Sequence, residues 1–559
     1  MTSYDSETVA RAKPLAASLH GIDMSPDGRT LQLTGTCRRD GTDGETPPDD
    51  VVRLVVVDSD GNTQTEVDTQ PRLRFEDGAR RWTGFEVDLP VDSIPVGSSF
   101  LSLHLPSASV DLPLAPAIGL LASSRPLVTD RRRVQAVAAR GANRVELISR
   151  RGGSVRWESA MLRRDFRDLI RRRPFAWARI ARIATRPFVP RSPIWLIGER
   201  SDTARDNGYH LYAYLCRERP DIRAYYVIDP KSDQRSKVAP LGRVIAHSSR
   251  KHRRLMLHAS VLANAYSLKH MVPKQWSPNA YLRHLAWRIG SHRVYLKHGI
   301  HVTTTELRRR STGYDLYLTS TPAETIASRE TSGYDRQIVE TGLPRYDALT
   351  PTPRSRTILF MPTWRLYLIP KLFSGKAEGD IPFEGSAYRQ FVVDLLTSPR
   401  LLALLEQHDH RLQLMPHYNL RDHLAGVQVS SARVEVLDGA GGDIQEVLRE
   451  CDLFVTDHSS TQFDVAYLGT PVIYAHFDEE DYQRGHAKPS WFDDEQNGFG
   501  PVVTDLEATI DAIEHYLDTD CQREETYDGR ARASFVHRDQ DNSRRAVTAI
   551  ESLLRPPTD

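Results

Sequence analysis

The chain has few cysteines and no long apolar run, and both absences narrow the class of protein. Its four cysteines are scattered over 559 residues without paired spacing, at Cys37, Cys216, Cys451 and Cys521. That pattern argues against a disulfide framework or a cysteine-based zinc site, and it favours a reducing cytosol. No apolar run reaches the roughly 18 residues that a membrane span needs. We therefore expect a soluble or membrane-peripheral protein.

An excess of charge of one sign is also missing. Lys and Arg number 74 and Asp and Glu number 73, so a net charge of +1 gives no reason to expect nucleic-acid binding. The first residues lack the basic and then apolar order of a signal peptide. No Walker loop, zinc-ligand spacing or Gly-x-Ser-x-Gly elbow occurs. No acidic pair is clearly placed to hold a metal, so we expect metal-independent chemistry and no cofactor.

A chain of this length is too long for one ordinary core, so two to four domains are expected. Residues 1–125 show alternating runs such as Val51–Val57 and Phe100–Leu105, separated by Asp-Gly pairs such as Asp27-Gly28. This spacing is typical of a small antiparallel β sandwich. It contains no recognisable set of ligand-binding residues, so we expect an accessory or docking domain. A carbohydrate-binding module is the more specific alternative.

Residues 126–190 are predicted to form an arginine-rich helical linker. Nine arginines and two acids lie between Arg163 and Arg186, and Pro174 interrupts the helical pattern. Apolar residues share one face before and after that proline: Phe166, Leu169, Ile170, Trp177, Ile180 and Ala181. Two interpretations stay open. A basic amphipathic helix would lie on an anionic membrane surface, whereas a solvated helix pair would pack its apolar face on a neighbouring domain.

Residues 191–350 and 351–559 alternate between strand-like and helical stretches. Such alternation predicts two doubly wound parallel sheets, and two consecutive Rossmann-type domains are the GT-B arrangement. Ligands of these sheets bind beyond the carboxyl ends of the strands. The predicted strands are Ile194–Ile197, Ala224–Asp229, Val244–Ala246, Val261–Ala263, Val294–Leu296 and Leu316–Leu318, and then Thr357–Met361, Arg411–Met415, Val434–Leu437, Leu453–Thr456 and Val472–Tyr474.

The stretch from Cys451 to Tyr474 is the centre of the second series. A buried strand over Leu453–Thr456 is followed by a turn and then by a helix that ends at Gly469. The start of such a helix presents free amides to an anion such as a phosphate, and Ser459 and Ser460 would add hydroxyls there. An equally weighted alternative is that the two serines only cap their own helix.

The same stretch resembles a known family. Thr456-Asp457-His458-Ser459-Ser460 followed by Phe463-Asp464 is similar to the phosphate-binding segment of the CDP-glycerol glycerophosphotransferase family, whose members polymerise teichoic-acid backbones. Members of that family usually carry an aromatic residue where His458 stands. Four more segments match in the family's order, all within about residues 194 to 500. They are His298-Gly299, Gly342-Leu-Pro-Arg345-Tyr-Asp347, Pro362-Thr363-Trp364-Arg365 and Pro416-His417.

Two of these segments contain candidate residues for the acceptor side and for phosphate. His298 directly follows a predicted strand, and Gly299 lets a substrate approach the backbone, so the histidine is well placed as a general base. The alternative is a structural histidine, one of 20 in the chain. Arg345 is expected to bind phosphate as a planar fork. The alternative there is a structural pair of Arg345 with Asp347.

The remaining segments contain candidates for the donor. His417 follows the strand Arg411–Met415, where a hydrogen-bond donor would stabilise charge on the leaving phosphate. The resemblance assigns Thr363 and Trp364 to nucleotide binding, although Trp364 also suits a core. Asp464 lies one helical turn beyond Ser460 and faces the same opening. In the family that aspartate contacts the donor.

The resemblance implies a glycerophosphotransferase of GT-B form at the cytoplasmic face of the membrane. Its donor would be CDP-glycerol or a related CDP-polyol, and its acceptor the hydroxyl end of a lipid-linked or growing polyol-phosphate chain. CMP would be the leaving group. Three alternatives stay open: a ribitol-phosphate donor, a GT-B nucleotide-sugar glycosyltransferase, and a non-catalytic protein that binds a surface polymer.

Overall fold

The computed structural model describes most of the chain. The described residues are 16–25, 27–39, 52–77, 80–105, 110–129, 132–303, 308–369, 382–417, 420–424, 427, 429, 431–437, 444–485 and 489–555. They divide into two compact units. Unit 1 comprises Met1–Asp202, Pro220–Tyr295 and Leu307–Leu316, and unit 2 comprises Thr203–Arg219, Leu296–Glu306 and Tyr317–Asp559. The domain boundaries that the sequence predicts at 125, 190 and 350 stay predictions.

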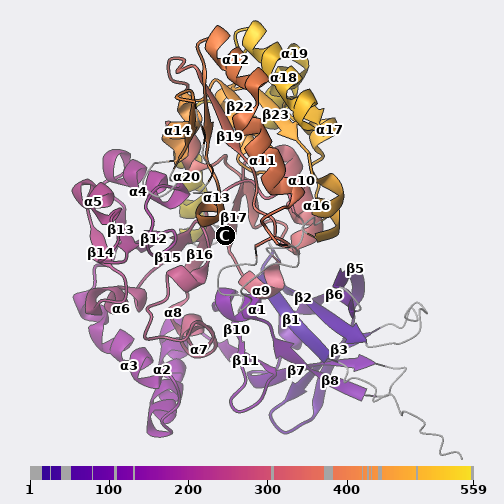
Figure 1. Cartoon of the computed structure of the whole chain (residues 1–559). Helices are drawn as coiled ribbons and strands as arrows, with labels where there is room; N and C mark the ends of the chain where they lie inside the picture. Colours follow the sequence, from indigo (N-terminus) through magenta and orange to yellow (C-terminus); the bar gives the residue numbers. More distant parts are fainter. Residues whose placement is uncertain are drawn as a thin grey trace, which may run out of the picture. The chain divides into compact units, whose positions relative to one another are not determined.

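Unit 1 begins with a β-rich region whose strands join in one mixed sheet of eleven strands (Figure 1). Its alternating apolar residues, such as Leu31, Leu33, Leu101 and Leu103, are buried in a common core. The strands are β1 (Ala16–Met24), β2 (Thr30–Arg39), β3 (Arg53–Asp58), β4 (Thr63–Asp68), β5 (Gln70–Asp77), β6 (Arg80–Pro90), β7 (Gly97–Leu105), β8 (Val110–Pro116), β9 (Leu127–Val128), β10 (Arg132–Ala138) and β11 (Val145–Arg151).

Two details of this region differ from the sequence-based expectation. The sheet is not purely antiparallel, because β1 and β8 pair in parallel. The segment predicted to be a helical linker begins with strands, since β11 pairs with β10 and with β7. Val134, Ala136, Val145 and Leu147 join the core of the sheet, which explains why these short runs are strands. Their apolar alternation is only two or three residues long, too short to show a period in the sequence.

The arginine-rich segment forms two helices, α2 (Ser154–Ile170) and α3 (Ala176–Thr185), which pack on each other. Phe175 separates them with a left-handed φ of 58°. Two of the nine arginines are buried. Arg164 donates to both carboxylate oxygens of Glu146 at 2.9 Å, and Arg179 pairs with Asp165 and Asp168. These two arginines therefore hold the helices in place within unit 1, and neither is free to contact a membrane or another external surface.

Unit 1 also contains five parallel strands in the spatial order β14-β13-β12-β15-β16. This is the order of a doubly wound sheet, with the first strand of the series in the middle. The strands are β12 (Ile194–Gly198), β13 (Arg223–Ile228), β14 (Val244–Ala246), β15 (Val261–Asn264) and β16 (His292–Tyr295), and the helices among them are α6 (Arg250–Met256), α7 (Pro278–Tyr281) and α8 (Trp287–Ile289).

Unit 2 contains a six-stranded parallel sheet in the order β21-β20-β19-β22-β23-β24. These strands are β19 (Thr357–Met361), β20 (Arg411–Leu414), β21 (Val434–Val436), β22 (Leu453–Thr456), β23 (Val472–Ala475) and β24 (Val502–Val503). Alternate residues of β19 are buried in two different clusters: Ile358 and Phe360 in one, and Leu359 in the other. Both faces of the sheet are therefore covered, as the near-continuous apolar runs predict.

Helices cover the two faces. Those packed with Ile358 are α11 (Ala387–Thr397), α12 (Pro399–Gln407) and α18 (Leu506–Asp518), and those packed with Leu359 are α14 (Ile444–Glu450), α15 (Gln462–Leu468) and α19 (Glu525–Ser534). Unit 2 further includes α4 (Asn207–Glu218), α10 (Pro322–Ser332), α16 (Glu479–Gly485), α17 (Asp494–Asn497) and α20 (Asn542–Leu554). From Tyr317 on, it also includes β17 (Leu316–Thr319), which pairs in parallel with β18 (Ile338–Glu340). All eleven strands predicted for residues 191–559 are present to within two residues at each end.

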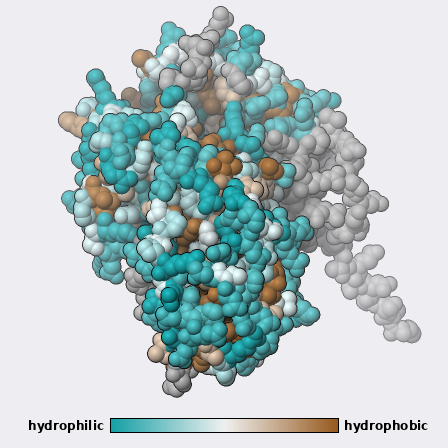
Figure 2. Space-filling view, turned by 90° about the horizontal axis from the view of Figure 1, so that it is seen from above, coloured by the Kyte–Doolittle hydropathy of each residue, from teal (hydrophilic) through white to brown (hydrophobic). Residues whose placement is uncertain are grey.

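The predicted fold class is confirmed: a GT-B-like pair of doubly wound Rossmann-type sheets follows a β-rich N-terminal region. Within the described ranges no helix is both long enough and apolar enough to cross a bilayer. On the face shown in Figure 2, the coloured hydrophobic residues occur in small patches among hydrophilic ones.

Candidate active site

A cavity of about 710 Å³ lies in unit 2 at the carboxyl ends of the central strands. Residues after β19, β20, β22 and β23 line it, as expected for a doubly wound sheet. Six of the nine residues predicted for the site are in its lining, namely His298, Thr363, Trp364, His417, Ser459 and Ser460. The other three, Gly299, Arg345 and Asp464, lie outside that lining. The structure therefore brings most of the predicted residues into one place.

The backbone around His298 is held by a buried ion pair. Lys297, the preceding residue, has a φ of 61°, which is rare for a residue other than glycine. Its ammonium group pairs with Glu324, and both side chains are buried. The Glu324 carboxylate also accepts hydrogen bonds from the backbone N–H of His301 at 3.0 Å and of Ser320 at 2.9 Å. The exposed His298 side chain is thus carried on a strained but well-supported turn.

Gly299 and His301 complete this turn. A Cβ added to Gly299 would lie 3.8 Å from Ser460 Oγ, so the backbone of Gly299 runs close to the serine turn. His301 donates from its backbone to Glu324 and its ring lies 4.9 Å from that of His298. Burial and the nearby Lys297 ammonium lower the pKa of His301 well below its usual value. His301 is therefore neutral at physiological pH.

Arg345 is bound by protein groups from every side. Its guanidinium donates to both oxygens of Asp464 at 2.8 Å, to Asp206 at 2.9 Å and to the carbonyl oxygen of His298. Burial lowers the pKa of this guanidinium, but the carboxylates of Asp464 and Asp206 outweigh it and raise that pKa above the usual range. Asp206 and Asp464 thus take donors that the sequence assigned to phosphate, and a contact of Arg345 with phosphate stays a prediction.

The alternative prediction for Arg345, a structural pair with Asp347, is wrong, because Arg345 pairs with Asp206 and Asp464. The Asp347 carboxylate accepts hydrogen bonds from the backbone N–H groups of Asn542 and Ser543, both at 2.8 Å. It therefore caps the N-terminus of α20, where a carboxylate satisfies free amides. Asp464 is likewise placed differently from the prediction. It is buried against Arg345 and does not line the cavity.

Ser459 and Ser460 form the turn between β22 and α15. Helix α15 begins at Gln462, and Thr461 before it makes no side-chain cap. Ser459 Oγ accepts a hydrogen bond from the backbone N–H of Thr461 at 3.3 Å, which stabilises the turn. Ser460 is exposed in the cavity. The two serines thus differ: Ser459 supports the local backbone and Ser460 faces the cavity.

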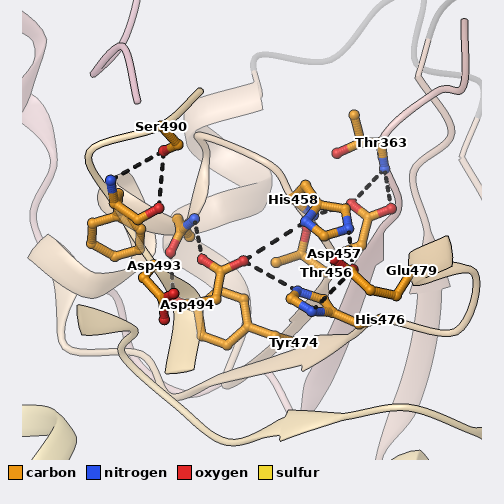
Figure 3. Close-up of polar contacts among 12 residues, drawn as sticks. Thr363, Thr456, Asp457, His458, Tyr474, His476, Glu479, Ser490, Asp493 and Asp494 are labelled. Atoms are coloured by element: carbon orange, nitrogen blue, oxygen red, sulfur yellow. Dashed lines mark hydrogen bonds and ion pairs between the residues drawn. The ribbon is translucent and has the colours of Figure 1, made fainter. Parts of the chain in front are cut away.

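Thr363, Trp364 and His417 form another part of the wall. The Trp364 ring stacks on that of His417 at 5.8 Å and 26°. The backbone N–H of Thr363 donates to both oxygens of Asp457, at 2.8 and 3.0 Å (Figure 3). The two strand ends after β19 and β22 are therefore tied together by Asp457.

A buried arginine supports this wall from behind. Arg365 pairs with Asp457 at 2.8 Å and with Asp478 at 2.6 Å. Burial raises the pKa of Asp457, but Arg365 and the Thr363 N–H outweigh burial and hold that pKa below its usual value. Arg365 ends the family segment Pro362-Thr363-Trp364-Arg365, where the sequence gives it no role, and its partner Asp478 lies far along the chain. Their spacing of 113 positions carries no signal in a single sequence.

A group of histidines and acids at one edge of the cavity was not predicted. His458 Nε2 lies 3.3 Å from Glu479 Oε2, and His476 Nδ1 lies 3.5 Å from the same oxygen. Asp494 faces both histidines, with its Oδ2 3.1 Å from His476 Nε2 (Figure 3). The one signal in the sequence is His458 itself, which stands where an aromatic residue is usual. The ring of Tyr482 stacks on the His458 ring, with the ring centroids 3.6 Å apart.

Comparison with known proteins gives consistent matches. The family model described as CDP-Glycerol:Poly(glycerophosphate) glycerophosphotransferase matches residues 179–552. The minor teichoic acid biosynthesis protein GgaB of Bacillus subtilis is 27% identical over 371 residues, which are 65% of this chain and 40% of that protein. A teichoic acid poly(glycerol phosphate) polymerase of Bacillus spizizenii is 24% identical over 232 residues, 38% of this chain and 54% of its own.

The chain therefore spans about half the length, or less, of these two relatives. A solved structure of the wall teichoic acid polymerase TagF aligns with 72% of this chain and 100% of that chain, at 16% identity and a TM-score of 0.48.

Proposed function

The chain belongs to the CDP-glycerol:poly(glycerophosphate) glycerophosphotransferase family, and from this premise we propose that it transfers glycerol phosphate, or a related polyol phosphate, from a CDP-linked donor to a hydroxyl group of a cell-surface polymer. One observation carries the proposal. Residues from five separate family segments were expected at one site, and four of those segments contribute to the lining of a single cavity. The names of the two relatives favour a teichoic-acid-type polymer as acceptor.

In the proposed reaction, an oxygen of the acceptor hydroxyl attacks the phosphorus that carries the polyol. A new P–O bond forms to the acceptor, and the P–O bond to the bridging oxygen of the diphosphate breaks. CMP leaves with that electron pair, and the hydroxyl proton passes to a base. His298 is the base in this scheme, because its exposed side chain lines the cavity and follows a rigid turn.

Arg345, Asp464 and Asp206 act in this scheme as positioning residues for His298. Arg345 donates to the His298 carbonyl and is itself fixed by the two carboxylates. Lys297 and Glu324 fix the other side of the same turn. Because the backbone of His298 is held from both sides, its ring stays in the geometry that proton transfer needs.

On the donor side, Ser460 and His417 would offer hydrogen bonds to the diphosphate, where charge develops as CMP leaves. Trp364, stacked on His417, provides an aromatic surface for the nucleotide. Thr363 joins this wall through its backbone bond to Asp457. These assignments rest on the lining of the cavity and on the family resemblance together.

The proposal is tested with purified full-length protein and a panel of donors. We expect CMP release from CDP-glycerol or CDP-ribitol in the presence of a short polyol-phosphate acceptor, and none from nucleotide sugars. The acceptor should gain one polyol phosphate for each CMP, measured by mass spectrometry. UDP release from a UDP-sugar would instead indicate a glycosyltransferase. Polymer binding without any nucleotide release would indicate a non-catalytic protein.

We further propose that the protein acts on a lipid-linked acceptor at the cytoplasmic face of the membrane, through α2, α3 and the residues after them. Large apolar side chains are exposed there: Phe166, Leu169, Ile170, Trp177 and Phe188, the last two at 54% and 87%. Six of the nine arginines are exposed on the same segment, namely Arg163, Arg167, Arg171, Arg172, Arg173 and Arg186. Exposed aromatics beside arginines suit an anionic bilayer surface.

A further inference from the structure

We propose that His458, His476 and Glu479 bind a zinc-type divalent cation at the edge of the cavity. This inference goes beyond the proposed transfer reaction, for which we expected no metal. Each of the three residues offers one ligand atom, and the three atoms lie within 4.8 Å of one another. Two imidazole nitrogens and one carboxylate oxygen are a ligand set that zinc uses in sites with an open fourth position.

The distances between the ligand atoms match a tetrahedral site. Ligands bound to zinc at about 2.0–2.1 Å stand about 3.3 Å apart in a tetrahedron. Glu479 Oε2 is 3.3 Å from His458 Nε2 and 3.5 Å from His476 Nδ1. Two of the three edges therefore have the right length before any ion is bound. The His458–His476 edge is the one that binding would adjust.

Within the part of the chain that the structure describes, two of the ligand atoms are buried and make no hydrogen bond of normal geometry. These atoms are His458 Nε2 and Glu479 Oε2, which face each other. Buried polar atoms are normally satisfied. A cation between them would satisfy both at once, together with the nearby nitrogen of His476.

Asp494 fixes the orientation of the His476 ring from the side away from Glu479. Its Oδ2 lies 3.1 Å from His476 Nε2, so this nitrogen donates its proton to the carboxylate. In the neutral ring, the other nitrogen, Nδ1, then carries a lone pair and lies 3.5 Å from Glu479 Oε2. Two acceptors at this distance repel each other unless a cation lies between them. A carboxylate behind a ligating histidine is the usual arrangement in zinc sites.

The chain of contacts continues behind Asp494. Gln462 donates to the other oxygen of Asp494 at 3.3 Å, and the hydroxyl of Tyr474 donates to Gln462 Oε1. On the opposite side, Tyr482 stacks on the His458 ring, which in turn stacks on His476 at 4.2 Å. The ligand side chains are therefore held by packing and hydrogen bonds, which favours binding without rearrangement.

The proposed ion would be accessible from the cavity, because His458, His476 and Glu479 all belong to its lining. Its fourth position would face the space where a donor phosphate or a water molecule is expected. Nitrogen ligands favour zinc over magnesium, which prefers oxygen ligands and retains its waters.

The test measures metal binding without any donor. Full-length protein is stripped with a chelator and titrated with ZnCl2 by calorimetry in the presence of a competing chelator, and bound zinc is counted by mass spectrometry. We expect one tight site in the wild type and no binding of Mg²⁺ there. His476→Ala and Glu479→Gln should each weaken zinc binding by at least about 100-fold, and Asp494→Asn by about 10- to 100-fold. Zinc should also raise the Tm of the wild type and not that of His476→Ala.

His515→Ala is the matched control. His515 lies 3.3 Å from Glu524, the same distance as between His458 and Glu479, but among the described residues no third ligand joins this pair. This variant should bind zinc as the wild type does. If folded wild-type protein binds no zinc, or if His476→Ala and Glu479→Gln bind it equally well, the proposal is wrong and the group shares protons instead. Because no donor is present, either of these results leaves the proposed transfer reaction untouched.

Discussion

Arg345 binds Asp464 as a bidentate pair, with Nη2 at 2.8 Å from each carboxylate oxygen and Nε at 3.1 Å from Oδ1. The same guanidinium donates to the backbone carbonyl of His298. Helix α15 is thereby connected to the turn that carries the proposed base. In our proposal, Arg345 and Asp464 therefore act on the site through the backbone of His298, although the sequence suggested that both contact the donor.

Arg345→Lys is expected to lower kcat by about 10-fold or more and to change the affinity for CDP-glycerol little. A lysine cannot contact Asp464, Asp206 and the His298 carbonyl at the same time, so the turn loses its support. CMP release and calorimetric donor binding measure the two effects separately. Arg400→Lys, at an exposed arginine, is the control for the substitution. A loss of donor affinity with unchanged kcat would show instead that Arg345 contacts the donor directly.

His298→Ala is expected to lower turnover by about 100-fold or more, because it removes the group that takes the acceptor proton. Donor affinity should change much less, since the substitution leaves the donor wall of Trp364, His417 and Ser460 in place. Single-turnover CMP release and calorimetry measure these quantities, with exposed His515→Ala as control. A fully active His298→Ala protein would exclude His298 as the base.

The strands of the two parallel sheets were predictable because buried parallel strands are short apolar runs with clear ends. Leu453–Thr456 is such a run, and its observed bounds agree with the prediction. Residues that follow such strands, including Thr363, His417 and Ser460, could be placed at one edge for the same reason. The position of the cavity could therefore be predicted from the sequence.

Partners distant in the sequence were not predictable. Asp206 precedes Arg345 by 139 positions, and nothing local indicates their pairing. The same holds for Asp494, which lies behind His476 at a distance of 18 positions. Asp347 stands two positions from Arg345, and that proximity favoured a pair which the capping of α20 replaces. The spacing of residues along the chain predicts helices and strands well, whereas the partners of buried charged groups depend on the three-dimensional fold.

Ser460→Ala and Ser459→Ala should have different effects. Ser460 faces the cavity, and a hydrogen bond to a charged phosphate contributes about 1.5–3 kcal/mol, so Ser460→Ala should weaken CDP-glycerol binding by about 10-fold or more. Ser459 supports the turn through Thr461, so Ser459→Ala should lower the Tm more than Ser460→Ala does. Calorimetry and thermal unfolding separate the two. Unchanged donor affinity in Ser460→Ala would mean that both serines are only structural.

Membrane attachment through α2 and α3 predicts a salt-dependent interaction with anionic vesicles. Each exposed arginine close to the surface contributes on the order of 1 kcal/mol, and salt screens this attraction. Changing Arg171, Arg172 and Arg173 to Glu should therefore release the protein from phosphatidylglycerol vesicles in co-sedimentation, while transfer to a short soluble acceptor continues. Trp177→Ser should weaken binding at every salt concentration, because its ring supplies the apolar part.

The matched control for charge changes three exposed arginines elsewhere, Arg217, Arg484 and Arg532, to Glu. It alters the net charge of the protein by the same amount and should leave vesicle binding close to that of the wild type. If both triple variants lose binding equally, the interaction depends on overall charge and not on α2 and α3. If the Arg171, Arg172 and Arg173 variant still co-sediments, the exposed face of these helices serves another contact and the membrane proposal is wrong.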